Sequence, residues 1–182
     1  MNSKTPHVIL GVTASIAIHR SLDVASELRK SGVVVSVVMT PNATRLIQPL
    51  MFQSMAHGAV YVDPFEVVPD FEHGHIRLAR EGDLFVVVPA TAGTLGKLAH
   101  GIADNLVTTT AIAFEGPKMF APAMNYRMWA NPLVEANVKC LRDIGWQLVP
   151  PQSGDLACGE EGPGRLAEVE TIIEAIQANL SV

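Results

Sequence analysis

The sequence predicts an α/β fold, a flavodoxin-like or Rossmann-like three-layer αβα sandwich built on a doubly wound parallel sheet. Short apolar runs rich in β-branched residues alternate with amphipathic helical stretches, at the spacing of βαβ units. The runs are apolar throughout, as in strands buried on both faces. We find no repeat, low-complexity tract or interdomain linker, so we expect residues 1–182 to form a single domain.

Each predicted strand is a short apolar run closed by a turn residue or a proline. The runs are residues 8–12, 33–39, 83–89, 118–122 and 147–149, and we take 83–89 as the central strand. The predicted helices cover residues 16–30, 43–56, 75–80, 95–114 with a break at Gly101, a stretch opened by Asn131 and Pro132, and a last stretch from Val169. Residues 61–74 are expected to form a surface loop. The glycine-rich segment 154–164 is expected to form a loop, and its part 159–164 is interpreted as a mobile lid.

Composition narrows the class of protein. Hydrophobic residues make up 48% of the chain and charged residues 17%, yet no apolar run approaches the ~20 residues of a membrane span. Because the chain is this rich in hydrophobic residues, we expect it to bury additional apolar surface in an oligomer. The net charge of −5 and the lack of a basic patch argue against nucleic-acid binding. No secretory signal is recognisable, and the two cysteines form no disulfide framework, so we expect a cytoplasmic protein with reduced thiols.

The segment after the central strand is the candidate ligand site. Residues 90–94 are small or carry hydroxyls, and they lie between a buried strand and a helix. Open α/β sheets bind ligands at such a point, where free backbone N–H groups and the helix dipole favour an anion. An ordinary βα turn accounts for these residues equally well.

The turn residues favour a mononucleotide over NAD. The first βα turn has Gly11, Thr13 and Ser15 in place of a G-x-G-x-x-G fingerprint. The second strand ends in Thr40-Pro-Asn, without the acidic residue that binds a ribose 2′-hydroxyl. No G-x-x-x-x-G-K-[ST] motif is present, which excludes a P-loop nucleotidase.

Three residues outside these turns could carry chemistry. His75 lies near His73, and the pair could be surface histidines or part of a metal site, although no third ligand has a recognisable spacing. Asn125 ends a strand, where a turn-forming role is the alternative. Cys158 is expected to be accessible in its glycine-rich loop, whereas Cys140 is expected in the core.

Four separated motifs, in order, make the chain resemble the homo-oligomeric flavin-containing cysteine decarboxylases over nearly its whole length. The motifs are His75-Ile; Pro89-Ala-Thr-Ala-x-Thr94 with Gly101-Ile-Ala-Asp-Asn-Leu106; Ala121-Pro-Ala-Met-Asn125 with Met128-Trp129; and Leu156-Ala-Cys-Gly159 with Gly162-x-Gly-Arg165. Two positions depart from the family pattern, which usually has Asn at Gly93 and Gly at Ala14. These departures suggest a divergent member and leave room for a different thiol substrate.

The resemblance implies FMN as the cofactor and assigns roles to individual residues. It implies catalysis by His75 and by Cys158, the latter as a proton donor, and binding of the substrate by Asn125 and Arg165. It also implies that Ala123 lies against the flavin ring. The remaining implied FMN contacts are Ser15, Ile16, Ala17, Thr40, Thr91, Ala92 and Thr94.

The resemblance implies decarboxylation of 4′-phosphopantothenoylcysteine, a small thiol carboxylate, to 4′-phosphopantetheine in coenzyme A synthesis. Oxidation of the thiol by flavin would create the electron sink that loss of CO₂ requires, and the resulting enethiol would then be reduced. Oxidative decarboxylation of a peptide C-terminal cysteine and a non-catalytic flavin-binding regulatory subunit remain alternatives. The expected assembly is a homotrimer or homododecamer whose flavin site is completed by a neighbour. Whether a ligase domain follows Val182 is left open.

Overall fold

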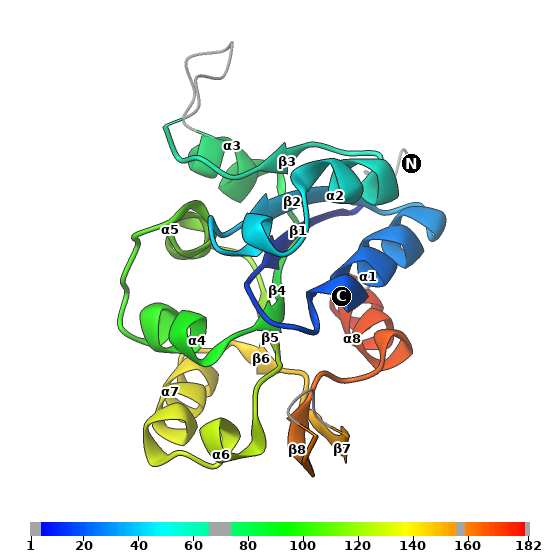
Figure 1. The fold of residues 1–182 in the computed structure, drawn as a ribbon. Helices are drawn as coiled ribbons and strands as arrows, with labels where there is room; N and C mark the ends of the chain where they lie inside the picture. The colour runs from blue at the N-terminus through cyan, green and yellow to red at the C-terminus, as the bar shows by residue number, and fades with distance from the viewer. Residues whose placement is uncertain (1–4, 66–73, 156–158, 181–182) are drawn as a thin grey trace.

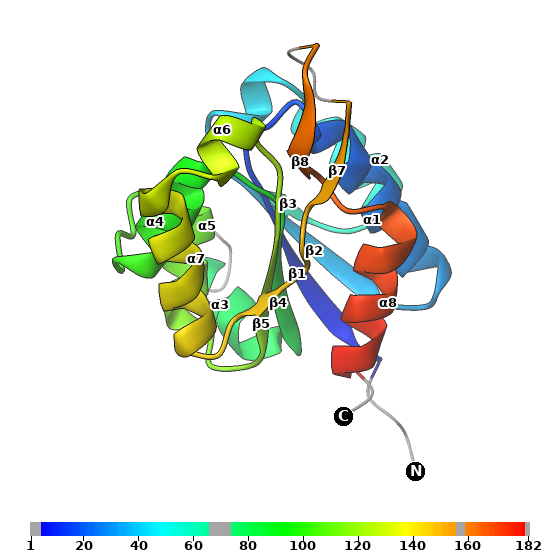
Figure 2. The ribbon, with the colours of Figure 1, turned by 90° about the horizontal axis from the view of Figure 1, so that it is seen from below.

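The computed structural model describes residues 5–65, 74–155 and 159–180, and these form a parallel sheet covered by helices on both faces (Figures 1 and 2). The six-stranded sheet has the order β3-β2-β1-β4-β5-β6, and all its pairings are parallel. The strands are β1 (His7–Val12), β2 (Val34–Met39), β3 (Val60–Tyr61), β4 (Leu84–Ala90), β5 (Lys118–Pro122) and β6 (Gln147–Leu148). The predicted doubly wound α/β fold is confirmed.

Two layers of helices enclose the sheet. The helices are α1 (Ile18–Lys30), the 3₁₀ helix η1 (Ala43–Arg45), α2 (Pro49–Ala56), α3 (Gly74–Glu81), α4 (Ala92–Ala99), α5 (Leu106–Ala113), α6 (Tyr126–Trp129), α7 (Pro132–Asp143) and α8 (Val169–Leu180). Helices α1, α2 and α8 cover one face, and α3, α4, α5 and α7 cover the other (Figure 2). Strand order reverses between β1 and β4, which places the usual ligand crevice of such sheets beyond the carboxyl ends of these strands.

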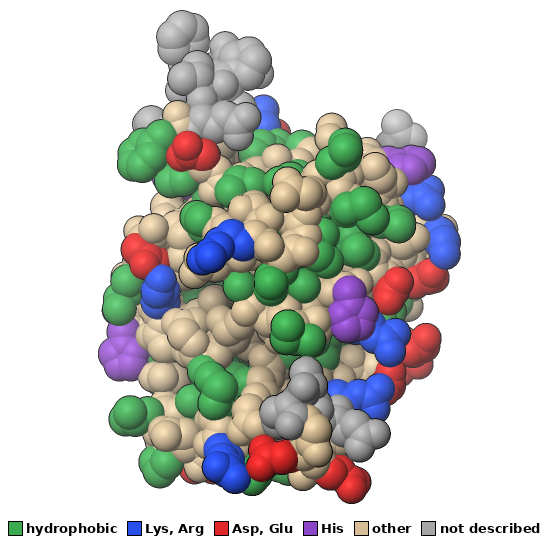
Figure 3. Space-filling model, viewed as in Figure 1, with side chains coloured by type: hydrophobic (Ala, Val, Ile, Leu, Met, Phe, Trp, Pro, Cys, Tyr) green, Lys and Arg blue, Asp and Glu red, His purple; other side chains and the backbone are tan. Residues whose placement is uncertain are grey.

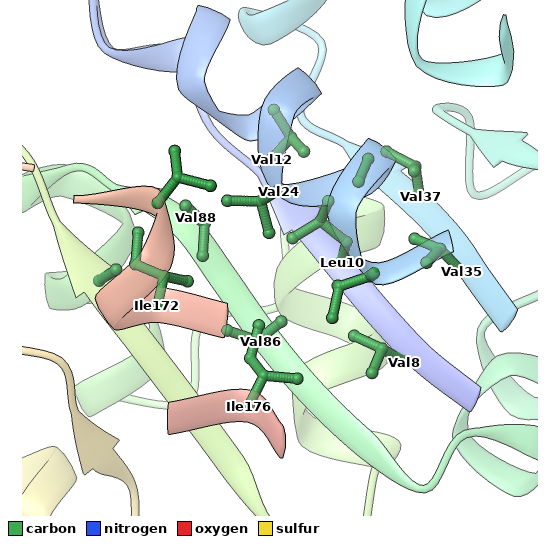
Figure 4. Packing of buried hydrophobic residues seen from close by; sticks show 14 of the residues in the cluster. Val8, Leu10, Val12, Val24, Val35, Val37, Val86, Val88, Ile172 and Ile176 are labelled. Carbon is green, nitrogen blue, oxygen red and sulfur yellow. The ribbon is translucent and has the colours of Figure 1, made fainter. Parts of the chain in front are cut away.

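Successive β1 side chains enter different cores, which explains why the strand is apolar throughout. Val8 and Leu10 pack beneath α1 and α8 (Figure 4), whereas Ile9 packs with Phe85 on the opposite face. All four side chains are fully buried. Alternation in a strand sends neighbouring side chains to opposite faces, so a sheet covered on both sides needs apolar residues at every position.

The helix expected over residues 43–56 is interrupted. Residues 43–45 form only η1, and α2 begins at Pro49. Gln48 is extended, with φ −68° and ψ 141°, because the residue before a proline is excluded from helical geometry. Proline is tolerated in the first turn of the new helix, where its missing N–H would have no partner in any case.

The candidate ligand segment is more helical than the sequence predicted. Helix α4 already begins at Ala92, and the Thr91 side chain caps it by accepting the backbone N–H of Thr94 at 3.3 Å. The break predicted at Gly101 is confirmed, since this glycine has a φ of +68° and lies between α4 and α5. Asn105 then starts α5 with a capping box that includes Thr108.

Two segments expected to be loops contain strands. Val60 and Tyr61, at the start of the expected surface loop, pair with Val37 and Val38 as the edge strand β3. Two residues are too few to show a periodicity. The segment expected to be a mobile glycine loop contributes to an antiparallel hairpin of β7 (Gln152–Asp155) and β8 (Glu161–Arg165). No described helix is long and apolar enough to cross a membrane.

Thr13 connects the first and central strands at the carboxyl edge of the sheet. Its buried hydroxyl donates to the carbonyl oxygen of Pro89 at 2.6 Å and accepts the N–H of Thr91 at 3.2 Å. A single side chain therefore satisfies two backbone groups at the turn where β4 gives way to α4.

Thr13→Val should lower the free energy of unfolding by about 1–3 kcal/mol, because an isosteric methyl leaves both backbone groups without this partner. Thr13→Ser is the matched control, since it keeps the hydroxyl, and it should lose less than Thr13→Val. Denaturant unfolding followed by circular dichroism measures both. Equal stability of Thr13→Val and the wild type would contradict the role given to this hydroxyl.

Candidate functional site

A cavity of about 400 Å³ opens where the β1–α1 turn, the end of β5 and the β7–β8 hairpin meet. Its volume falls in the range of small-molecule and cofactor sites. It lies at the carboxyl edge of the sheet, as the fold predicts for a ligand. The residues around it are Ser15, Ile16, Ala17, His19, Arg20, Ala123, Met124, Asn125, Gly164, Arg165, Leu166, Ala167 and Glu168.

The amino end of α1 gives the cavity an anion-binding wall. Ala17 occupies the N-cap position without a side-chain cap, and the first turn holds no acidic residue. The positive end of the helix dipole therefore favours a phosphate or carboxylate, although the N–H groups of Ile18 and Arg20 already donate to backbone oxygens. Ser15 fixes the turn, because its Oγ accepts the N–H of Ala17 and donates to the carbonyl oxygen of Ala123, both at 3.3 Å.

The hairpin is held against the end of β5 by backbone contact. The N–H of Met124 donates to the carbonyl oxygen of Gly164 at 2.9 Å. Gly164 has a φ of +123°, and a Cβ there would lie 2.4 Å from the Met124 oxygen. Only glycine permits both this conformation and this approach, so Gly164 sets the position of the cavity wall.

Asn125 lines the cavity, and local hydrogen bonds set the orientation of its side-chain amide. Its Oδ1 caps α6 by accepting the N–H of Arg127 at 2.9 Å, which leaves Nδ2 as the side-chain donor. Nδ2 lies 3.4 Å from Oε2 of Glu160, whose Oε1 lies 3.2 Å from an Arg127 guanidinium nitrogen. The chain thus already places a carboxylate against this amide.

Three basic side chains line the same cavity. Arg165 pairs with Glu168 at 2.9 Å, and Arg20 lies 3.8 Å from Asp23. His19 is exposed, and its Nδ1 lies 3.0 Å from the Ile16 carbonyl oxygen. Both arginines are therefore partly neutralised, and the uncapped helix end remains the strongest feature for binding an anion.

Half of the sequence-based site lies around this cavity, namely Ser15, Ile16, Ala17, Ala123, Asn125 and Arg165. The structure brings these residues together, and their roles stay predictions. His19, Met124 and the stretch 166–168 also line the cavity and were not predicted. They flank predicted residues in the chain, and that proximity was the only sequence signal for them.

The predicted hydroxyl residues lie on neighbouring turns and are engaged locally. Thr40 is buried at the end of β2 and accepts the N–H of Ala43 at 3.2 Å. Thr91 and Thr94 share a hydrogen bond of 3.0 Å in the cap of α4, next to Ala92. None of these residues lines the cavity, so their contacts with a cofactor stay predictions.

Of the two predicted catalytic residues, the structure describes only His75, and this residue stands apart from the cavity. His75 lies in the first turn of α3, half-buried, and Figures 1 and 2 place α3 and the hairpin on opposite sides of the molecule. Cys158 lies outside the described residues, as does His73. Within residues 5–65, 74–155 and 159–180, no three His, Cys, Asp or Glu side chains are grouped to hold a metal ion.

Comparison with known proteins identifies the family. The model of the Flavoprotein family matches residues 1–181. The chain belongs to this family. A probable phosphopantothenoylcysteine decarboxylase of Streptococcus mutans is 42% identical to this flavoprotein over 178 residues, which cover 97% of the chain and 99% of the relative.

Longer relatives match only in part. The coenzyme A biosynthesis bifunctional protein CoaBC of Bacillus subtilis is 39% identical over 175 residues. This match covers 96% of the flavoprotein but 43% of the bifunctional relative. The flavoprotein therefore spans less than half of that relative.

Solved structures agree with this assignment. A PPC decarboxylase mutant complexed with pantothenoylaminoethenethiol superimposes with a TM-score of 0.88 at 30% identity, covering 98% of the flavoprotein and 100% of that chain. The FMN-dependent cysteine decarboxylase SpaF gives a TM-score of 0.85 at 32% identity, covering 97% and 98%. The fold match thus extends over nearly the whole chain.

Gly164→Ala should displace the hairpin from β5 and enlarge or distort the cavity, because its Cβ would overlap the Met124 oxygen. We expect a loss of about 1–3 kcal/mol in unfolding free energy, typical of a strained backbone position, and weaker ligand binding. Gly93→Ala is the matched control, since a Cβ there meets nothing within 4 Å. Thermal unfolding compares the two variants, and equal melting temperatures would count against the packing described here.

Proposed function

We propose that this flavoprotein decarboxylates 4′-phosphopantothenoylcysteine to 4′-phosphopantetheine with FMN as its cofactor. The observation that carries the proposal is the cavity that combines an uncapped helix end, suited to a phosphate, with an amide that already faces a carboxylate. The likeness to a probable phosphopantothenoylcysteine decarboxylase, over nearly the full length of both chains, supports the same reaction.

The cavity fits a flavin mononucleotide. The turn of Ser15, Ile16 and Ala17 lines the cavity at the positive end of the α1 dipole, which suits the phosphate, and the small Ala123 leaves room for a flat ring. Thr40 and residues 91–94 lie on adjacent turns and would contact the rest of the cofactor. When bound, FMN supplies the removal and return of two electrons that decarboxylation of a thiol carboxylate requires.

Asn125 is suited to hold the carboxylate that is lost. A neutral amide orients the anion by donating hydrogen bonds, without the strong ground-state stabilisation that a buried cation would give. Its donor is already fixed in direction by the cap of α6. We assign Arg165 to the substrate as well, because it lines the same cavity from β8.

A second copy of the chain would bring His75 to the cavity. Apolar side chains are exposed near His75, where Ile76 is 43% exposed and Phe65 is 89% exposed. They are also exposed near the cavity, where Ile16 is 67% exposed, and along α2, where Leu50 is 68% exposed. Figure 3 shows hydrophobic side chains gathered on the face of the molecule that is turned to the viewer in Figure 1.

Two distinct exposed apolar regions suit a head-to-tail contact between copies, which closes into a ring. We therefore propose a trimer, or a multiple of one, in which His75 of one copy reaches the cavity of the next. Cys158 is assigned as the proton donor for the last reduction, since a thiol with a pKa of about 8.5 is a far stronger acid than a hydroxyl.

The purified protein should carry FMN and should convert 4′-phosphopantothenoylcysteine to 4′-phosphopantetheine, as read by absorbance and mass spectrometry. Accumulation of the enethiol, without the final reduction, would favour the alternative of a peptide-cysteine decarboxylase. Bound FMN without any conversion would favour a regulatory subunit. A protein that binds no FMN would contradict the proposal.

Mixing two inactive variants tests the shared site. His75→Asn and Asn125→Asp should each abolish decarboxylation when present in every copy. Mixed oligomers formed by co-expression should regain activity, because some cavities then combine an intact His75 with an intact Asn125. Two preparations mixed without subunit exchange are the control. If the co-expressed variants fail to regain activity, His75 and Asn125 of each site come from the same copy, which would contradict the shared site.

A further inference from the structure

The contact between Asn125 and the hairpin residue Glu160 has a consequence for substrate binding. We propose that Glu160 is a resident carboxylate, which occupies the Asn125 amide until the carboxylate of the substrate displaces it. This inference rests on the proposed function, because it assigns Asn125 to a carboxylate substrate. It adds Glu160 as a positioning residue that distinguishes the substrate from its decarboxylated product.

The geometry makes Glu160 and a bound carboxylate compete at the Asn125 amide. Asn125 Oδ1 is held by the Arg127 N–H at 2.9 Å, so the amide cannot rotate without uncapping α6. Nδ2 lies 3.4 Å from Oε2 of Glu160, and this nitrogen carries two N–H groups. A ligand carboxylate that accepts from the same nitrogen would lie close to the like charge of Glu160, so the two anions compete for this amide.

The contact between Asn125 and Glu160 is weak enough for another carboxylate to replace Glu160. At 3.4 Å the hydrogen bond from Nδ2 is longer than usual and therefore weak, and the Arg127 contact of Glu160 is 3.2 Å. The Glu160 side chain is 40% exposed and that of Arg127 is 72% exposed, so both can turn into water. Exposed ion pairs of this kind contribute little stability and are readily broken.

The backbone that follows Glu160 packs closely against residues 124–126, so we assign the exchange to a side-chain movement. A Cβ at Gly162 would lie 2.9 Å from the Tyr126 Cβ, and one at Gly164 would lie 2.4 Å from the Met124 oxygen. These approaches hold β8 against α6 and keep Glu160 within reach of Asn125. Loss of CO₂ removes the competing anion and lets Glu160 return to the amide. Glu160 therefore disfavours the carboxylate form of a ligand relative to its decarboxylated form.

The test compares equilibrium binding of two unreactive ligands to the FMN-loaded protein by calorimetry. One is the substrate analogue with serine in place of cysteine, which keeps the carboxylate but lacks the thiol. The other is the same molecule without its carboxylate. Glu160→Gln should bind the carboxylate ligand about three- to tenfold more tightly, because it removes the competing negative charge while keeping the size of the side chain. Its affinity for the decarboxylated ligand should stay within about twofold of the wild type.

Glu161→Gln is the matched control, because Glu161 is exposed, begins β8 and lies opposite Asp155 in the hairpin. It removes the same charge one residue further on, and it should leave the ratio of the two affinities unchanged. An unchanged or weaker affinity of Glu160→Gln for the carboxylate ligand would overturn the inference, as would an equal gain in Glu161→Gln. If the wild type binds neither ligand, the proposed function fails and the inference falls with it.

Discussion

The pairing of β1 with β4 is the contact on which the rest of the structure depends. These strands lie side by side at the centre of the sheet, although more than seventy residues separate them in the chain. The order in which successive strands are added to the sheet changes direction between them. Their carboxyl ends therefore diverge into helices on opposite faces, leaving a crevice. Thr13 bridges that crevice through two hydrogen bonds to the turn after β4. The walls of the cavity take their positions from this frame.

A second constraint is the close approach of backbones at the cavity rim. Gly164 contacts the Met124 carbonyl, and Gly162 contacts the Tyr126 side chain, so the hairpin lies directly on the segment after β5. Side chains at either glycine would separate the two segments. The backbone of the rim is thus closely packed, while its charged side chains, such as Glu160 and Arg127, are partly or largely exposed to water. Such a site can keep its shape while it exchanges one anion for another.

The site binds anions mainly through groups that carry no full charge. The α1 end contributes the positive end of a helix dipole, which suits a permanently bound phosphate. Asn125 contributes a neutral amide, which suits an anion that must be bound and then lost. Arg20 and Arg165 approach acidic side chains of their own helix or turn, so they add less positive charge than their number suggests.

Much of the architecture could be predicted from local patterns. Apolar runs identified the long strands, because both faces of each strand are covered, as Ile9 and Leu10 illustrate. The cap at Asn131 and the break at Gly101 were also predictable, since each depends on the conformation of its own residue. The strand β3 and the β7–β8 hairpin were missed. Their pairing depends on distant partners, and their residues are too few or too rich in glycine to show a period.

For the site, the sequence by itself determined the kinds of groups present. The hydroxyls, the asparagine and the glycine-rich segment indicated the chemistry, and the motif resemblance assigned the roles. Only the tertiary structure decided which of them meet. Asn125 and Glu160 are 35 residues apart in sequence and become partners because glycine contacts seat β8 on α6. His75, by contrast, lies on the other side of the sheet. Proximity across a fold is set by packing, which no local pattern encodes.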